Sequence, residues 1–321
     1  MVIALAAYFT GLLMRRCMDS NPSVTSYPDI AGVAFGRKGR ITALVFICLE
    51  LYLVATGLLI LEGDNLHKLS PHFGFKIGNT KMDGRHSFVI VAGLIIMPTL
   101  WLNDLSVLSY LSFGGGLPMA VSLYTFCYGA HAMFPTIYLS MKKKSQFPIV
   151  LIISFLTCTT TYVIMAILGY VIYGEDVQSQ VTLNLPTEKA SAKVAIYTIL
   201  ASPIAKYALT IMPIATAIEN YLPVKHKNNN VISAMIKTSL LVSTVVLAII
   251  FPSFESVTSL SGAALIVIVS FVLPCACYLK IFKVYRNFGV DLVVIMGLVV
   301  LAILVGVVGT YSSIRETFKH V

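Results

Sequence analysis

His131 is the first residue whose type and position could do chemistry. It lies in the segment "YGAHAMFP" (128–135), within a stretch from 117 to 140 that contains no charged residue. Imidazole gains or loses a proton near physiological pH, so this side chain could serve a proton-coupled cycle or contact a bound substrate. The alternative is a structural histidine that bonds to a neighbouring helix. The sequence leaves both interpretations open.

Two further charges stand inside apolar stretches. Glu50 lies near the middle of 41–62, and Lys206 lies about halfway along 194–218. An ionised side chain at the centre of a bilayer costs about 3 kcal/mol or more unless it is paired or protonated. Glu50 is therefore a candidate proton site or the partner of a buried cation, and a Glu50–Lys206 ion pair is one hypothesis. Structural pairing that locks helices together is the alternative.

The composition indicates which elements must position these side chains. The chain has 321 residues, of which 57% are hydrophobic and only 12% are charged, whereas soluble domains carry about 25% charged residues. The net charge of +9 could suggest a nucleic-acid partner, but the basic residues occur in short clusters at the ends of apolar runs, which is a signal of membrane topology. We predict an all-α polytopic membrane protein that does not bind nucleic acid.

Apolar runs predict the spans of a single domain, 1–321. Crossing about 30 Å of hydrocarbon takes roughly 20 residues, and a shorter run occurs at 87–102. The predicted spans lie near 41–62, 148–173, 194–218, 232–253, 257–279 and 289–311.

Charge predicts the side of the membrane on which each connecting segment lies. Basic clusters occur at 15–40, 142–144, 225–227 and 280–286. The positive-inside rule places them in the cytosol, where those within "YPDIAGVAFGRKGR" (27–40) are available to anionic lipid. The segments predicted on the opposite side are 63–86, 174–193, 254–256 and 312–321. Glu62 and Asp64, in "LEGDN", are expected in a solvated turn at the membrane boundary.

Two regions do not fit a simple alternation of spans. The stretch 105–140 would have to leave and re-enter the cytosol, but it is too short for two crossings and a turn. It is either a hairpin that dips into the membrane or the site of a lost span. The N-terminal run before Arg15 lacks a preceding positive region and a cleavage site, so we expect it to be the end of a span whose beginning is absent.

The segment around His131 predicts a broken helix. Gly129 lies about where the bilayer centre should be, and a break there is tolerated only where it lines a cavity. In transporters, half-helix N-termini attract a carboxylate and freed carbonyl groups bind an ammonium or a cation, which suits an amino acid zwitterion. We therefore predict substrate contacts from Tyr128, Gly129, Ala130 and His131. For Tyr128, aromatic packing within the bundle is an equal alternative.

The sequence argues against an enzyme and against a cofactor or metal. No segment expected to face water carries a Ser/His/Asp or metal-binding set, and no Lys-Ser/Thr follows the triple glycine at 114–116. Cys275 and Cys277 have no histidine or second cysteine pair beside them. The cysteines are expected to be small buried hydrophobic residues.

Six long strings resemble the amino acid/auxin permease family, in particular its plant vacuolar amino acid transporter branch. They are "YPDIAGVAFGRKGR" (27–40), "LELYLVATGLLILEGDNL" (49–66), "WLNDLSVLSYLS" (101–112), "YGAHAMFPTIYLSM" (128–141), "LGYVIYGEDVQSQVTLNLP" (168–186) and "ASPIAKYALTIMPIATAIE" (201–219). The resemblance implies an eleven-span inverted-repeat fold whose first and sixth spans are broken. Relative to that pattern, this chain lacks the first span, part of the second and the fifth, with an internal deletion near 116–117.

The resemblance also implies a function. Family members move neutral amino acids across the vacuolar or plasma membrane, driven by proton gradients. We therefore expect a secondary active transporter in the vacuolar or another endomembrane that exchanges neutral amino acids against protons. Lys206 would then stand where sodium-driven relatives of the wider fold hold a cation. The alternative is a transport-inactive truncated paralogue or a regulatory membrane fragment. A nutrient sensor is disfavoured by the short C-terminal tail, and a channel by the lack of a polar stripe.

Overall fold

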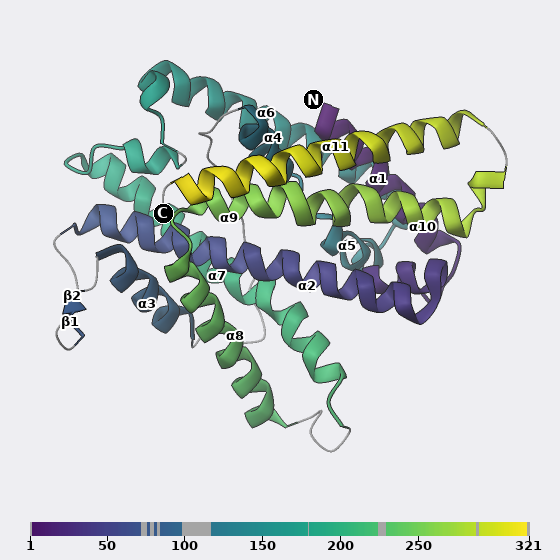
Figure 1. Ribbon diagram of the computed structural model, residues 1–321, viewed down its shortest axis with the longest axis horizontal. Helices are drawn as coiled ribbons and strands as arrows, with labels where there is room; N and C mark the ends of the chain where they lie inside the picture. Colours follow the sequence, from purple (N-terminus) through teal and green to yellow (C-terminus); the bar gives the residue numbers. More distant parts are fainter. Residues whose placement is uncertain are drawn as a thin grey trace. The chain divides into compact units, whose positions relative to one another are not determined.

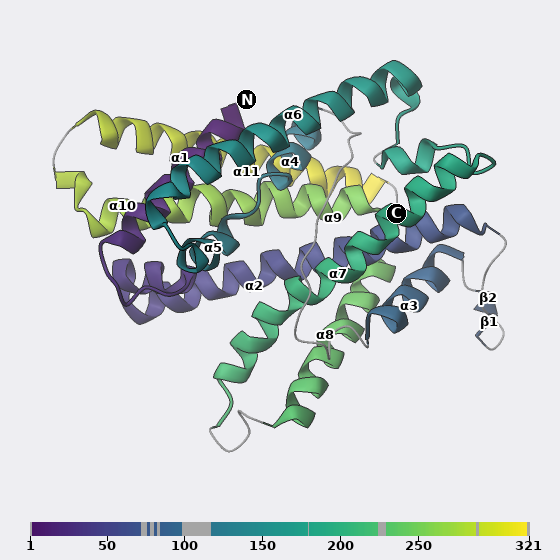
Figure 2. The same cartoon turned by 180° about the vertical axis from the view of Figure 1, so that it is seen from behind.

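The computed structural model describes residues 2–71, 76–77, 80–81, 84–97, 117–178, 180–223, 229–286 and 289–319. The predictions for 98–116, including the triple glycine, and for the basic residues at 225–227 lie outside these ranges. Figures 1 and 2 show the helices from two sides. The chain divides into two compact units. Unit 1 comprises 1–50, 115–171 and 259–316, and unit 2 comprises 51–114, 172–258 and 317–321.

The predicted spans are confirmed as helices. Within the described ranges, six helices are long and apolar enough to cross a membrane: Tyr27–Leu69, Lys144–Tyr173, Ala190–Asn220, Asn230–Ile250, Phe254–Ile281 and Val290–Arg315. Each contains most of one predicted run. The run at 87–102 is represented by the shorter apolar helix α3, Gly84–Ile96. The all-α polytopic class is therefore confirmed.

Unit 1 contains helices from three separate parts of the chain. They are α1 (Val2–Asp19), the first part of α2 (Tyr27–Leu69), α4 (Leu117–Phe126), η2 (His131–Met133), α5 (Phe134–Ser140), η3 (Lys144–Gln146), most of α6 (Phe147–Tyr173), η6 (Ser261–Val272), α10 (Leu273–Ile281), η7 (Val284–Arg286) and most of α11 (Val290–Lys319). Helix α1 packs against α10, α5 and η6, and α4 packs against η6. Figure 1 shows α1, α10 and α11 together in this unit.

Segment η6 is a π-helix of 12 residues within the span 254–281. π-Helices are rare and usually no longer than one turn, and the apolar pattern of this run did not predict one. Gly262 allows close packing near the start of this segment, because an added Cβ atom would overlap the carbonyl oxygen of Ser122 on α4. Tyr27 also donates a hydrogen bond from its hydroxyl group to the carbonyl oxygen of Val269. Small residues and such polar bonds are the usual means of joining helices in membranes.

The ends of three helices that adjoin predicted cytosolic clusters meet in unit 1. At the end of α1, Arg16 donates to the Tyr278 hydroxyl of α10 over 3.2 Å. The neighbouring Asp19 accepts from the Tyr138 hydroxyl of α5, and the ammonium of Lys144 lies 5.3 Å from the centroid of the Tyr138 ring. The contacts thus link the ends of α1, α5 and α10, as the predicted topology requires.

Unit 2 is built from the remaining helices and short turns. They are the second part of α2, β1 (Lys76–Ile77) paired with β2 (Thr80–Lys81), α3, η4 (Gly174–Asp176), η5 (Val181–Asn184), α7 (Ala190–Asn220), α8 (Asn230–Ile250) and most of α9 (Phe254–Leu260). Helices α3, α7 and α8 pack against one another (Figure 2). Hydroxyl pairs tie α8 to its neighbours, Tyr207 with Thr244 and Tyr52 with Ser243.

Helix α2 corrects one prediction. It is interrupted at Gly36, where φ is 70°, but then continues to Leu69. Glu62 and Asp64 therefore lie inside a helix, and the solvated turn predicted for them is wrong. The Gly-Asp-Asn sequence is typical of a turn, but tertiary contacts bury these polar side chains and override the local preference. Only 2% of Glu62 is exposed.

Candidate functional site

The predicted break around Gly129 is confirmed. Helix α4 ends at Phe126 and η2 begins at His131, so residues 127–130 are not helical. The Cys127 carbonyl oxygen accepts a bond from the Tyr162 hydroxyl at 3.2 Å. Among the described residues, no hydrogen bond reaches the carbonyl oxygen of Gly129. This carbonyl group is therefore available to a bound donor.

A close approach explains why the break contains glycine. A Cβ atom added to Gly129 would lie 2.5 Å from Cδ1 and 3.0 Å from Cγ1 of Ile266 on η6. A larger residue would have to displace the Ile266 side chain or push the break away from the π-helix. Gly129 thus brings the backbone of the break directly against η6.

His131 is fully buried and bonded to α1. Its Nε2 atom lies 2.9 Å from Thr10 Oγ1 and 3.1 Å from the Ala7 carbonyl oxygen. Because a carbonyl oxygen only accepts, Nε2 must carry the hydrogen. Nδ1 is then an acceptor in the neutral ring, and it has no hydrogen-bond partner among the described residues. His131 thus makes the bond to a neighbouring helix that the structural alternative requires. Its Nδ1 atom still has a lone pair that could accept a proton.

Tyr128 makes the contacts expected of a packing residue. Its hydroxyl group lies 2.9 Å from the Tyr124 hydroxyl and 2.7 Å from Thr159 Oγ1. Its ring stacks on Phe155 with a centroid separation of 5.7 Å. Ala130, in contrast, is exposed. In this conformation the side chains of Tyr128 and His131 are engaged within unit 1, so the backbone of the break is the part best able to bind a ligand.

A small apolar cavity lies beside the break. Its volume is about 50 Å³, and Thr125 of α4, Phe271 of η6 and Ala6 of α1 are among the residues that line it. The Phe271 ring is also 6.2 Å from the ring of His131. A space of this size holds a water molecule or little more. An amino acid could enter there only if the surrounding helices moved apart.

Glu50 and Lys206 belong to different units. Glu50 is the last residue of α2 that belongs to unit 1. Only 2% of it is exposed, and its Oε2 atom has no hydrogen-bond partner within the described part of the chain. Lys206 lies half-buried on α7 of unit 2. Their pairing stays a prediction.

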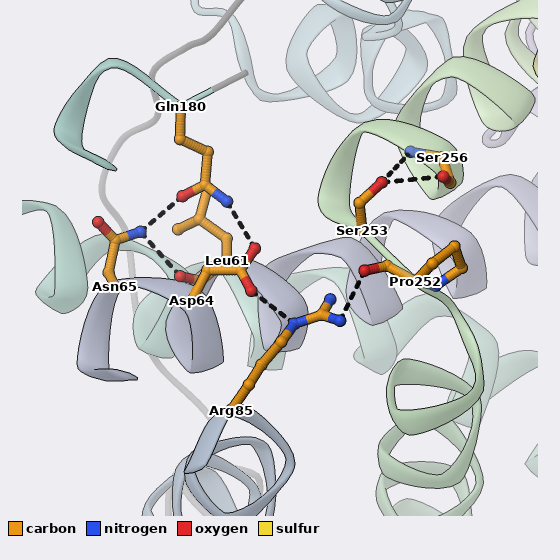
Figure 3. Close-up of polar contacts among 8 residues, drawn as sticks. All are labelled: Leu61, Asp64, Asn65, Arg85, Gln180, Pro252, Ser253 and Ser256. Carbon is orange, nitrogen blue, oxygen red and sulfur yellow. Dashed lines mark hydrogen bonds and ion pairs between the residues drawn. The ribbon is translucent and has the colours of Figure 1, made fainter. Parts of the chain in front are cut away.

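Unit 2 contains a polar network that the sequence did not reveal (Figure 3). Arg85 of α3 donates from Nε to Asp64 Oδ1 and from Nη1 to the Pro252 carbonyl oxygen, each over 2.6 Å. Gln180 donates from Nε2 to Asp64 Oδ2 over 3.0 Å, and its Oε1 accepts from Asn65 Nδ2 at 2.6 Å. The network joins α2, α3, the turns before α7 and the end of α8. The sequence predicts that one side of the membrane holds the segments 63–86, 174–193 and 254–256. The network brings together residues that lie in or next to these segments.

The turns before α7 form a strap, which we define as residues 174–178 and 180–184. Gln178 N and Asp176 O bond to the side chain of Asn184 over 2.7 and 2.9 Å. Lys68 of α2 donates to the carbonyl oxygen of Leu183. Gln180 and Lys68 thus fasten the strap to α2. Charged residues in 63–86 were visible in the sequence, but nothing in their spacing indicated these partners.

Comparison with known proteins gives consistent results. The family described as transmembrane amino acid transporter protein matches residues 1–116 and 114–317. Amino acid transporter AVT1I of Arabidopsis thaliana is 44% identical over 353 aligned positions, which cover 100% of this chain and 87% of the relative. Amino acid transporter AVT1J of the same plant is 41% identical, covering 98% of this chain and 82% of the relative. For amino acid transporter AVT1C the values are 37%, 98% and 63%.

Proposed function

Because this chain belongs to the family of transmembrane amino acid transporter proteins, we propose that it moves neutral amino acids across the vacuolar or another endomembrane in exchange for protons. Membership of the family supports amino acid transport as the general activity and argues against an enzyme. The preference for neutral substrates, the coupling to protons, the exchange mode and the membrane are our proposals.

The helix break in unit 1 is the observation that carries the proposal. The Gly129 carbonyl oxygen accepts no hydrogen bond from any residue that the structure describes, so it can accept from the ammonium group of a substrate. Segment η2 begins immediately beyond it at His131. The side chains around the break, such as Phe155, Ile266 and Phe271, carry no charge. A substrate side chain with a net charge would find no partner there, which supports a neutral substrate.

Two buried groups in unit 1 support proton coupling. Nδ1 of His131 and Oε2 of Glu50 are acceptors without a hydrogen-bond partner among the described residues. Each can take up a proton without breaking an existing bond. Ionisable groups at such depth in a membrane protein are expensive and commonly form proton relays.

A transport-inactive membrane protein is the second candidate. The family match falls into two segments that meet at 114–116. The alignment with AVT1I has 353 positions, more than the 321 residues of this chain, so the relative carries residues that are absent here. Both observations support an internal deletion near 116–117. Such a deletion could leave a regulatory partner of complete relatives.

Uptake by vesicles distinguishes the two candidates. Vesicles containing the full chain should accumulate labelled leucine, but not lysine or glutamate, when a pH gradient is imposed. A protonophore should abolish the accumulation. AVT1I in the same vesicles is the matched control. If this chain transports no leucine under any gradient while AVT1I does, the inactive alternative is correct.

Replacing His131 by glutamine separates its two roles. The glutamine amide can donate to Thr10 and Ala7 as Nε2 does, but it cannot bind a proton. If His131 carries a coupled proton, folding should be unchanged, while leucine accumulation should fall about tenfold for each unit of the pH gradient. His86→Gln, the same change on α3, should leave accumulation unchanged. Normal pH-dependent uptake by H131Q would assign a structural role to His131.

A further inference from the structure

We propose that Glu62 of α2 is a proton-binding site in unit 2 and that its proton keeps the strap closed. Glu62 is almost completely buried, and its Oε1 atom has no hydrogen-bond partner among the residues that the structure describes. A charged carboxylate in such a place is far less stable than the neutral acid. Glu62 therefore holds a proton in this conformation. The physiological role of that proton rests on the proposed proton-coupled transport, but the site itself does not.

The cationic side chains that the structure describes around Glu62 do not neutralise a carboxylate at this position. The charge of Arg85 on α3 is paired with Asp64, and its Nη1 donates to a carbonyl oxygen, while its Nη2 has no hydrogen-bond partner among the described residues. Lys68, on α2 itself, is bound to the Leu183 carbonyl oxygen of the strap. His67 packs against Phe88, with 6.5 Å between the ring centroids.

Among the described residues, no cation of the other elements at this end forms an ion pair with Glu62. These cations include His86 of α3 and the exposed Lys189 and Lys193 near the start of α7. Asp176 of the strap is exposed and acidic, and Glu255 of α9 is acidic and has contacts of its own. On α8, Ser243 bonds to Tyr52, and Tyr52 lies about 15 Å along α2 from Glu62. Lys237 comes before Ser243, farther from the end of α8 that Arg85 contacts, so it is not a partner for Glu62. Among the described residues, the proton is the simplest counterpart for Glu62.

Asn65 supplies the second observation. Its amide nitrogen donates to the Leu61 carbonyl oxygen over 2.8 Å and to Gln180 Oε1 over 2.6 Å. A carbonyl oxygen only accepts, so the orientation of the amide is fixed. Oδ1 of Asn65 then points away from Gln180 (Figure 3) and is a buried acceptor without a partner. It needs a donor, and a protonated carboxyl group is one.

The helix places the two acceptors on neighbouring positions. Residues three apart on a helix have Cβ atoms about 5–6 Å apart, and α2 continues beyond both Glu62 and Asn65. A proton on Glu62 can thus satisfy two acceptors at once, by a bond from the acid to Asn65 Oδ1. Asn65 in turn holds Gln180, so the proton supports the fastening of the strap.

The sign of the pH dependence follows directly. The proton binds more tightly when the strap is closed, because ionised Glu62 is stable only when water reaches it. The closed state is therefore favoured at low pH, and its advantage is lost as the pH rises through the titration of Glu62 in the closed state. An opened strap would admit that water and release the proton.

Infrared spectroscopy tests the protonation in the unmodified chain. In lipid nanodiscs at neutral pH, the full chain should show the carbonyl stretching band of buried protonated carboxyl groups. Glu62→Gln should remove one component of this band, while Glu50→Gln, the matched change in unit 1, should leave that component in place. If E62Q leaves every component of the band unchanged, Glu62 is ionised in the unmodified chain and the proposal is overturned.

Hydrogen exchange tests the link to the strap. The Leu183 amide donates to the Gln180 carbonyl oxygen within the strap over 2.9 Å, so its exchange reports the loosening of the turn that carries Gln180. The ratio of its exchange rates in the unmodified chain and in E62Q cancels the intrinsic effect of pH. At pH values where Glu62 is ionised in the open state but protonated in the closed state, this ratio should rise by about tenfold per pH unit, and it should level off at higher pH. A ratio that is constant with pH would contradict the proposed link.

Neither measurement requires transport. A chain that moves no amino acid would refute the proposed function but could still show both the infrared band and the rising ratio. Conversely, proton-driven uptake without a protonated Glu62 would refute this inference alone.

Discussion

Arg85→Ala is expected to lower the free energy of unfolding by about 3 kcal/mol, because removing one partner of a largely buried ion pair leaves the other uncompensated. Only 16% of the Arg85 side chain and 15% of the Asp64 side chain are exposed. The substitution also removes the bond to the Pro252 carbonyl oxygen at the end of α8. Thermal denaturation in detergent, followed by circular dichroism, measures the loss.

Two further variants make this result specific. Arg37→Ala removes the same side chain from an exposed position on α2 and should change stability by less than about 0.5 kcal/mol. Arg85→Met combined with Asp64→Leu removes both charges, and it should recover part of the loss, since apolar residues can replace a buried pair. Equal stability of R85A and R37A would show that the network contributes nothing to folding.

The sequence was sufficient where the signal is local. The six spans followed from the length of their apolar runs, because hydrocarbon requires a minimum number of apolar residues. The break at 127–130 followed from Gly129 in an uncharged stretch with Pro135 close behind. Contacts also bring Arg16 and Lys144, from two of the predicted cytosolic clusters, to one end of unit 1. Their placement in the cytosol stays a prediction.

Partners distant in sequence could not be predicted. The side chain of Asp64 meets Gln180, 116 residues later, and His131 meets Thr10, 121 residues earlier. No periodicity encodes such pairs, because each depends on how helices pack. The π-helix at 261–272 could not be predicted from the sequence for a related reason. A run of apolar residues has the same composition whether its backbone bonds span four residues or five.

Glu62 shows how a local rule fails. Glycine and acidic residues at the end of an apolar run usually mark a turn, and the same residues appear here in the middle of α2. The helix continues because α3 and the strap supply partners for Asp64 and Asn65. Glu62 receives none among the described residues, and this departure from the expected pattern is what identifies it as a candidate site.

Gly262→Ala is expected to destabilise unit 1 by about 1–3 kcal/mol, as overpacking does in a closely packed core. The added methyl group would overlap the Ser122 carbonyl oxygen and lie 3.0 Å from the carbonyl carbon. Both atoms belong to the backbone of α4, so no side-chain rotation can relieve the clash. Helix α4 must move instead, and it leads directly into the break at 127–130.

Two other glycines provide a graded control for G262A. At Gly309 of α11 the nearest obstacle is the hydroxyl group of Ser122, which can rotate, so Gly309→Ala should cost less. Gly297 has no atom within 4 Å of the added methyl group, and Gly297→Ala should stabilise its helix by up to about 1 kcal/mol. Thermal denaturation should therefore rank the variants as G297A, G309A and G262A, in falling stability. Because only G262A displaces the α4 backbone, it alone should also abolish leucine uptake if the chain is active. Equal stability of G262A and G297A would mean that α4 and η6 do not pack this closely.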